Sequence, residues 1–375
     1  MLSPVQVVTL LRPKTRADLL AAAAFSSLVF TATPFLIPAT ADDFDVSLGA
    51  ASLISTAQLA GFVLASWVVG RFFDPSRRLF IAAISLAAVA NGARALVPWY
   101  TGLLGLRVLA GIAIAILAWL GWQEVFGDDD RMGDVAVVGP VVGIAGAPLA
   151  SLLAEAAGTS AVYGTLAVAG LLPLLLRPPG VEMGANAPRR FQRSRAIPVT
   201  RLILLCLSVI TFSGSAVFVF LAALGEDSLG IDPVVLSLAF SANAAVGIPA
   251  ARYRGRRPLA GLWLLGTATA AVVTTTVDNA SIFWVALALW GFFFWAGVPG
   301  IFKLLAERSA NPADRAGDAQ SVMAAGRVFG PLFGAAFVEG GSVEALGITA
   351  GALLAAAAVT LALTERRVPP RQAEA

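Results

Sequence analysis

The segment Gly70-Arg-Phe-Phe-Asp-Pro-Ser-Arg-Arg78 is a short polar stretch between two long apolar runs, 49–69 and 79–97. Each run is about twenty residues long, which is the length that a helix needs to cross the hydrocarbon core of a bilayer. The segment contains three arginines, and arginine next to a spanning helix marks the cytoplasmic side of a membrane. The sequence therefore predicts two membrane-spanning helices joined by a cytoplasmic loop.

The composition of the whole chain is typical of a polytopic membrane protein. Apolar residues make up 58% of the 375 residues and charged residues 13%, whereas a soluble globular protein has about 25% charged residues. The chain has no histidine and one cysteine, Cys206, which lies in an apolar run. These counts exclude a disulfide framework and a cysteine-based metal site, and they remove the commonest metal ligand. We therefore expect no metal and no cofactor.

Apolar runs of about twenty residues predict twelve spanning helices in an all-α fold. The runs cover residues 17–40, 47–69, 79–98, 101–123, 134–156, 158–176, 201–224, 232–251, 258–277, 280–304, 317–339 and 342–363.

The charges of the linkers follow a one-sided pattern. Of the 26 Lys and Arg residues, all except Arg94, Arg107 and Arg327 lie in the two tails, in every second linker or at the adjoining ends of spans. The other linkers hold no basic residue and carry the acids Asp42, Asp43, Asp45, Glu226, Asp227 and Asp278. Because basic residues concentrate on the cytoplasmic side, both termini are expected in the cytoplasm.

The linker 177–200 is the longest and is rich in Pro, Gly and Arg, so it is the natural boundary between two halves. We expect an N-terminal six-helix bundle over 1–176, a cytoplasmic linker over 177–200, and a C-terminal six-helix bundle with a short tail over 201–375. Gly-Pro-x-x-Gly occurs at 139–143 in the fifth span and at 330–334 in the eleventh. These positions are equivalent if the second half repeats the first.

Taken together, these features resemble the major facilitator superfamily over essentially the whole chain. The loop 70–78 is similar to the family signature between helices 2 and 3. Arg107-Val-Leu-Ala-Gly111 in the fourth span is similar to the family's Arg-x-x-x-Gly signature, and Gly139-Pro140-x-x-Gly143 to a signature found chiefly in proton-coupled antiporters.

The motifs depart from the family at three glycines, which are replaced by Ser76-Arg77, Ala115 and Ile144. The resemblance implies a secondary transporter that works by alternating access, of the branch that exports drugs and metabolites in exchange for protons. It also implies that Asp74 caps a helix of the opposite half and latches the outward-facing state, since a carboxylate is favourable at a helix N-terminus. The gating loop then comprises Gly70, Asp74, Arg77, Arg78 and Arg131, with Arg131 as the nearest ionic partner. Topology alone would account for the arginines.

Three arginines lie inside predicted spans. Arg94 is close to the outer end of the third span, where its side chain can snorkel to the surface, Arg107 is near the outer end of the fourth, and Arg327 is about ten residues into the eleventh. Arginine at the centre of a bilayer costs at least about 2.5 kcal/mol, so each must face protein or water. The resemblance places the helix of Arg107 against the central cavity, which favours a substrate or coupling role over a purely structural one. Arg327 lies near the midplane, and both a structural anchor and a substrate contact remain open.

The resemblance implies that helices 1, 4, 7 and 10 line the cavity. Candidate cavity or coupling residues are Thr31, Arg107, Gly111, Trp119, Thr211, Trp290, Trp295 and Arg327, and candidate hinge residues are Gly139, Pro140 and Gly143. Hydroxyls, aromatic rings and an arginine in one cavity suit a small neutral or anionic amphiphile.

Proton coupling has no obvious carrier, because no Asp or Glu lies in the middle of a predicted span. A facilitator or importer is therefore an alternative to an exporter, as is a non-transporting sensor or assembly protein on a transporter scaffold. We expect no enzymatic activity, because little in the spans could carry hydrolysis. The expected partners are a small-molecule substrate, the lipid bilayer and protons, with no nucleic acid, and the protein is expected to be a monomer. Arginine outnumbers lysine 24 to 2, which hints at the inner membrane of a bacterium.

Overall fold

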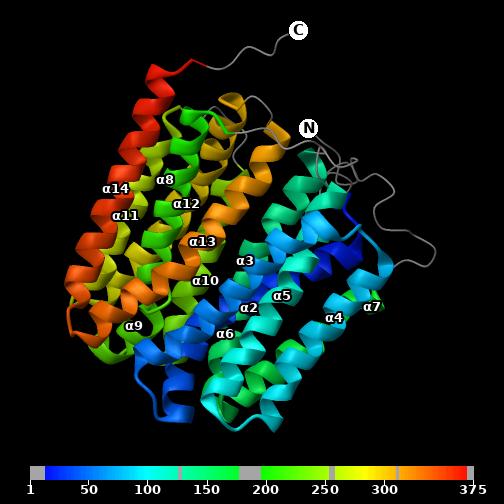
Figure 1. The fold of residues 1–375 in the computed structure, drawn as a ribbon. Coiled ribbons are helices and arrows are strands. Elements are labelled where there is room, and N and C mark those ends of the chain that lie inside the picture. The colour runs from blue at the N-terminus through cyan, green and yellow to red at the C-terminus, as the bar shows by residue number, and fades with distance from the viewer. Residues whose placement is uncertain (1–12, 126–128, 177–195, 253–257, 310–311, 370–375) are drawn as a thin grey trace, which may run out of the picture.

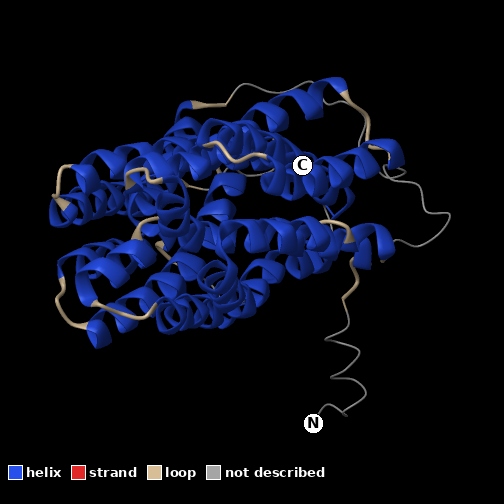
Figure 2. Ribbon diagram, turned by 90° about the horizontal axis from the view of Figure 1, so that it is seen from below, coloured by secondary structure: helices blue, strands red, loops and turns tan. Residues whose placement is uncertain are grey.

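A computed structural model describes residues 13–125, 129–176, 196–252, 258–309 and 312–369. Helix is the regular structure throughout this part of the chain (Figure 2). Most of the expected linker 177–200, namely residues 177–195, lies outside the described residues.

The first half of the chain forms a bundle in which two helices begin at serine caps. Ser47 and Ser76 each accept a hydrogen bond from the backbone N–H three residues later, at Ala50 and Leu79, and a serine in this position stabilises a helix by about 1 kcal/mol. Ser76, which replaces an expected glycine, is therefore the N-cap of α4. The elements are α2 (Ala17–Phe44), α3 (Leu48–Phe72), α4 (Arg77–Gly92), the 3₁₀ turn η1 (Ala93–Leu96), α5 (Tyr100–Val125), α6 (Asp129–Ala169) and α7 (Leu172–Leu175).

The second half forms a bundle of similar construction. Its elements are α8 (Pro198–Phe218), α9 (Leu221–Leu229), α10 (Pro233–Arg252), α11 (Ala260–Thr276), α12 (Ala280–Glu307), α13 (Pro312–Glu339) and α14 (Val343–Arg367). The run 201–224, predicted as one span, is divided between α8 and α9. The completely buried Phe220 lies between these two helices and packs against Gly334 of α13.

Ten helical segments of the described chain are long and apolar enough to cross a membrane, and α11 is apolar but shorter, at 17 residues. One of the ten, Val137–Leu175, extends from α6 into α7 and contains a reversal of direction. Gly139 faces Ser27 of α2, Gly158 lies beside Asp43, and Gly170 lies beside Phe25. The chain therefore follows α2 to its end and then returns along it.

The reversal in α6 depends on Gly158, whose φ of +68° is a conformation that residues with a side chain rarely adopt. Asp43 accepts hydrogen bonds from the backbone N–H and the hydroxyl of Thr159, the first residue after the turn. The reversal coincides with the boundary predicted between the runs 134–156 and 158–176.

The two halves lie side by side, with the first drawn blue to green and the second green to red (Figure 1). In the first half α2 packs against α6, and α3 against α5; in the second half α8 packs against α13, and α11 against α12 and α14. The main contacts between the halves are α6 with α10 and α3 with α13. The two helices that carry Gly-Pro-x-x-Gly, α6 and α13, are therefore both interface helices.

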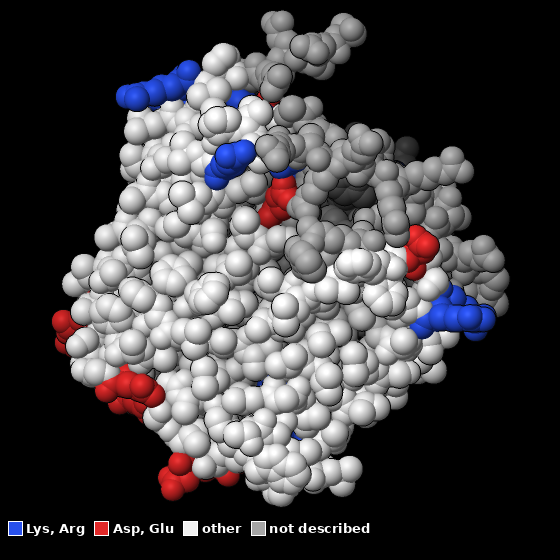
Figure 3. Space-filling view, in the orientation of Figure 1, with Lys and Arg blue, Asp and Glu red and all other residues white. Residues whose placement is uncertain are grey.

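The molecule has ends of opposite charge. The end that holds the start of α2 and the end of α14 carries Arg16, Arg201, Arg308 and Arg366, and is called the basic end. The opposite end carries Asp43, Asp45, Glu226 and Glu339, and is called the acidic end. Figure 3 shows Lys and Arg groups at the upper and right edges and Asp and Glu groups at the lower left.

The apolar core divides toward the basic end. One buried cluster joins both halves and includes, from the second half, residues near the acidic end such as Val217, Phe240 and Leu346. A separate cluster lies toward the basic end and contains only second-half residues, among them Ile203 and Leu361. The halves thus share a core near the acidic end and have separate cores near the basic end.

Candidate functional site

Arg107 lies inside the first half, with 1% of its surface exposed. Its Nη2 donates a hydrogen bond of 2.9 Å to Asn91 Oδ1, and its Cζ lies 4.2 Å from the centre of the Tyr163 ring. A longer contact of 3.5 Å joins Nη1 to Gln58 Oε1. The guanidinium is therefore enclosed by side chains from α3, α4 and α6 as well as its own helix, α5.

The Arg107 cluster is incompletely satisfied. Its named partners are neutral, and both Arg107 Nε and the Tyr163 hydroxyl are buried without a hydrogen-bond partner. Moving a cation from water into the protein interior costs free energy, and here no anion offsets that cost. Stability alone therefore gives little reason for an arginine at this position.

The second half provides an internal comparison for Arg107. Gly111, four residues after Arg107, packs onto the carbonyl of Gln58, and Gly291 packs in the same way onto the carbonyl of Asn243. The residue four positions before Gly291 is Leu287, which is completely buried. The same helix packing is therefore achieved with leucine in place of arginine.

Arg327 is half-buried near the middle of α13. Its neighbour Gly326 packs against Ser208 and Thr211 of α8, and the carbonyl of its other neighbour, Val328, accepts a hydrogen bond of 3.4 Å from Thr56 of α3. Among the described residues, none forms a hydrogen bond or an ion pair with Arg327.

Most of the predicted hydroxyl and tryptophan residues lie in seams between helices. Thr31 contacts Gly146 of α6, and the Thr211 hydroxyl donates to the carbonyls of Leu207 and Ser208 beside α13. Trp295 fills the space beside Gly247 of α10, and Trp119 is half-buried on α5. Each of these contacts is ordinary packing between helices.

Trp290 belongs to an aromatic chain that crosses between the halves. Its ring centre lies 5.6 Å from Phe218 of α8, which lies 5.4 Å from Phe240 of α10, which in turn lies 5.1 Å from Phe35 of α2. Such edge-to-face and tilted pairs are favourable beyond the area that they bury. The three phenylalanines were not predicted, since their sequence positions follow no common pattern.

A polar contact also joins the halves at the acidic end. The Ser47 hydroxyl, at the start of α3, donates a hydrogen bond of 2.5 Å to Glu339 Oε1, at the end of α13. The Glu339 side chain lies over Gly49, where any side chain would displace it. This clamp between Ser47 and Glu339 was not predicted either, because the two residues lie 292 positions apart.

The gating loop is at the surface of the basic end. Gly70 is in the last turn of α3, and Asp74, Arg77 and Arg78 are exposed. Arg131 is placed at the ends of α2 and α5. Its Nη1 donates to the carbonyl of Glu124 at 3.2 Å, and its own carbonyl accepts a hydrogen bond from the Thr15 hydroxyl.

The predicted hinge lies at the contact between the halves. Gly139 faces Ser27 of α2, whereas Gly143 faces Ala244 of α10, where an added Cβ would approach to 2.9 Å. At the residue after Gly143, the carbonyl of Ile144 accepts a hydrogen bond of 2.7 Å from the Ser241 hydroxyl of α10. Pro140 is buried and, lacking an N–H, weakens the helix at this point.

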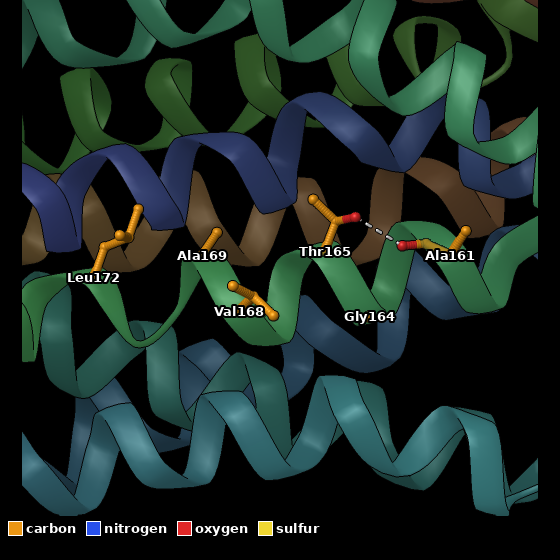
Figure 4. Close-up of a pocket in the computed structure, with 6 residues that line it drawn as sticks. All are labelled: Ala161, Gly164, Thr165, Val168, Ala169 and Leu172. Carbon is orange, nitrogen blue, oxygen red and sulfur yellow. Dashed lines mark hydrogen bonds between the residues drawn. The ribbon is translucent and has the colours of Figure 1, made fainter.

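An open groove of about 550 Å³ lies on the outer surface of α6 (Figure 4), lined by Ala161, Gly164, Thr165, Val168, Ala169 and Leu172. The Thr165 hydroxyl already donates to the carbonyl of Ala161, and Val168 is 68% exposed. The groove suits contact with lipid tails and offers no chemistry for recognising a polar substrate. Within the described residues, no group of three or more His, Cys, Asp or Glu could hold a metal ion.

Comparisons with known proteins agree with this architecture. The family model described as Major Facilitator Superfamily matches residues 19–327. Among solved structures, a bacterial homolog of the human lysosomal transporter Spinster is similar in its inward-facing, occupied form, with a TM-score of 0.75 and 14% identity over 98% of both chains. Its inward-facing, unoccupied form has a TM-score of 0.68, with the same identity and coverage.

The human organic anion transporter MFSD10 (TETRAN) is also similar, with a TM-score of 0.67 and 16% identity over 92% of this chain and 98% of that one. No curated protein matches the chain. At these identities the solved structures indicate a shared fold only.

Proposed function

The chain belongs to the major facilitator superfamily, and from this premise we propose that it is a secondary transporter that works by alternating access. The observation that carries the proposal is the division of the core. The halves share apolar packing near the acidic end and have separate cores near the basic end. Two bundles joined at one end only can rock about their interface and expose a central site to one side at a time.

The proposed transporter has twelve spans with both termini in the cytoplasm. The ten candidate segments become twelve when the reversal in α6 is counted as two spans and the shorter α11 is included. The positive-inside rule places the basic end in the cytoplasm. With that orientation the structure corresponds to an inward-facing state, and we place the protein in the inner membrane of a bacterium.

In the proposed cycle, α6 and α13 are the helices whose contacts with the other half change. Each packs against the first helix of its own half, α2 or α8, and against a helix of the other half, α10 or α3. The clamp between Ser47 and Glu339 and the chain from Phe35 to Trp290 close the acidic end. Asp74, exposed in this state, would engage the other half when the basic end closes.

We propose export of a small neutral or anionic amphiphile, with protons as the exchanged ion. A facilitator or importer is the second candidate, because no Asp or Glu lies at the middle of a spanning helix in the described part of the chain. The neighbour named as an organic anion transporter is 16% identical. This likeness supports the fold, and the substrate has to be identified by experiment.

The proposal is tested in proteoliposomes that carry a pH gradient and a pH-sensitive dye. Cationic, neutral and anionic amphiphiles are added in turn. Collapse of the gradient by one class, absent from protein-free vesicles, is the result expected of an antiporter. Equilibration of labelled compounds without collapse would favour the facilitator. If no compound moves in either assay, the transport proposal is contradicted and the sensor or assembly role gains support.

A further inference from the structure

We propose that Arg327 is the anion-recognition residue of the transport site and that the cargo carries an oxyanion headgroup, such as a carboxylate, sulfonate or phosphate. The inference rests on the proposed transport function and narrows its substrate class. It depends on three properties of Arg327, which are its depth in the membrane, the direction of its side chain and its lack of a counter-ion.

Arg327 lies too deep for its charge to be explained by the membrane surface. It is twelve residues from Glu339 at the acidic end of α13, which corresponds to about 18 Å along a helix. The other end of the helix, at residue 312, is about 22 Å away by the same rise per residue. A cation at this depth must face protein or a water-filled space.

The contacts of its neighbours show which way Arg327 points. Successive residues of a helix are rotated by about 100°. Gly326 faces α8 and the carbonyl of Val328 faces α3, so Arg327 lies between these two directions. Phe329, on the opposite side, is 60% exposed where lipid would lie. The Arg327 side chain therefore points into the space between a helix of the first half and a helix of the second.

Part of the Arg327 side chain is open to solvent, because it is half-buried, whereas Arg107 is 1% exposed. Gln320 lies seven residues before Arg327, two turns nearer the basic end, and residues at this spacing share one side of a helix. Gln320 is exposed, although its side of α13 faces the interior rather than lipid. In the proposed cycle, a dissolved ligand would reach Arg327 from this end of α13.

Arg327 has the chemistry of an anion-binding residue. No carboxylate in the described part of the chain pairs with it, whereas Arg107 is enclosed by Asn91, Gln58 and the Tyr163 ring. A guanidinium presents five N–H donors and can bind a planar or tetrahedral oxyanion through two of them at once. A bound oxyanion would offset the cost of holding a cation at this depth in the membrane, and a cationic ligand would add to it.

The binding test uses tail-matched amphiphiles that differ only in headgroup charge. Purified protein in a neutral maltoside detergent is titrated with 1-octanesulfonate, octyl glucoside and octyltrimethylammonium, and the thermal unfolding midpoint is followed. We expect 1-octanesulfonate to raise the midpoint of the wild-type protein. Arg327→Gln should weaken this binding by at least about tenfold, because a hydrogen-bonded charge pair is lost. Arg327→Lys should retain part of it.

The matched control is Arg94→Gln, which removes an arginine that pairs with Asp43 at the acidic end and should leave 1-octanesulfonate binding unchanged. Equal binding by wild-type and Arg327→Gln proteins would overturn the inference, as would a preference of the wild type for octyltrimethylammonium. If added phosphatidylglycerol competes with 1-octanesulfonate in the wild type but phosphatidylcholine does not, the oxyanion site is confirmed and a lipid headgroup is a ligand.

A separate transport test distinguishes this inference from the proposed function. Uptake of labelled 1-octanesulfonate is measured in phosphatidylcholine vesicles. Binding that depends on Arg327 without any uptake would contradict the transport function and leave the anion site standing. Uptake that Arg327→Gln does not reduce would contradict the anion site and leave the transport function standing.

Discussion

At the scale of single residues, the two halves place different side chains, arginine and leucine, at one equivalent helix-packing position. Arg107 and Leu287 each lie four residues before a glycine that packs onto a neighbouring helix. Leucine meets the packing requirement without a charge. Arginine brings a buried cation whose Nε has no partner. Replacing a buried charge by an apolar side chain of similar volume is often neutral or stabilising, so we propose that the charge of Arg107 serves transport.

We predict that Arg107→Leu leaves the fold intact and reduces transport by at least about tenfold, the effect of losing one charged hydrogen bond in the working state. The thermal unfolding midpoint should be unchanged or higher. The measurements are thermal unfolding in detergent and initial uptake rates in vesicles. Arg94→Gln, which removes an arginine at the acidic end, is the control. Normal uptake by Arg107→Leu would reduce Arg107 to a packing residue.

The second prediction at this scale concerns Asp74. The side chain is exposed, so Asp74→Asn should change the unfolding midpoint very little. If the carboxylate latches the outward-facing state on a helix end, its loss should slow transport by about threefold or more. Initial uptake rates are compared with those of Glu344→Gln, which neutralises an exposed acid at the opposite end. Equal rates for the two variants would contradict the latch.

At the scale of helices, close approach depends on particular glycines. Gly111 of α5 lies directly against the carbonyl of Gln58 on α3, whereas Gly105 and Gly121 on the same helix have no atom within 4 Å of an added Cβ. One helix therefore contains both a glycine that the packing requires and two that it does not. Small residues of the first kind allow membrane helices to approach closely.

We predict that Gly111→Ala lowers the stability of the protein by about 1–3 kcal/mol, the usual cost of overpacking. Gly105→Ala and Gly121→Ala should be neutral or slightly stabilising, since alanine favours a helix over glycine. Thermal unfolding of the three purified variants compares them directly. A midpoint for Gly111→Ala as high as those of the other two would mean that α3 and α5 are farther apart than described.

At the scale of the whole molecule, the proposed cycle depends on how the two halves contact each other. The acidic end is closed by the shared core, by the aromatic chain from Phe35 to Trp290 and by the clamp between Ser47 and Glu339. Alternating access requires each of these contacts to break once per cycle. A covalent bond across the clamp should therefore stop transport without unfolding the protein.

We predict that a protein with Ser47→Cys and Glu339→Cys, in a Cys206→Ser background, loses transport when a short bis-methanethiosulfonate bridges the pair through two disulfides. Reduction should restore it. The control pair is Asp43→Cys and Thr159→Cys, which bridges two parts of the first half that already touch. Uptake before and after bridging is the measurement. Full uptake by the bridged clamp would contradict a moving closure at the acidic end.

The membrane class, the family and nearly all helix positions could be predicted from the chain alone. The reversal at Gly158 coincides with a predicted boundary, and Gly139-Pro140, predicted from its motif as part of a hinge, lies in a helix that contacts the other half. These features are local. A spanning helix satisfies all its backbone hydrogen bonds within itself, so its position depends on the length and polarity of one stretch of sequence.

The partners of individual side chains were decided only by the tertiary structure. Tyr163 beside Arg107, Phe240 beside Phe35 and Glu339 beside Ser47 join positions far apart in the chain. Hydropathy does not encode such pairs, because lipid tails and the protein interior are equally apolar and a helix can face either with the same residues. Sequence alone thus determined that Arg327 lies deep in a membrane. The rotation of α13 between α3 and α8 decided that its charge faces the space between the two halves.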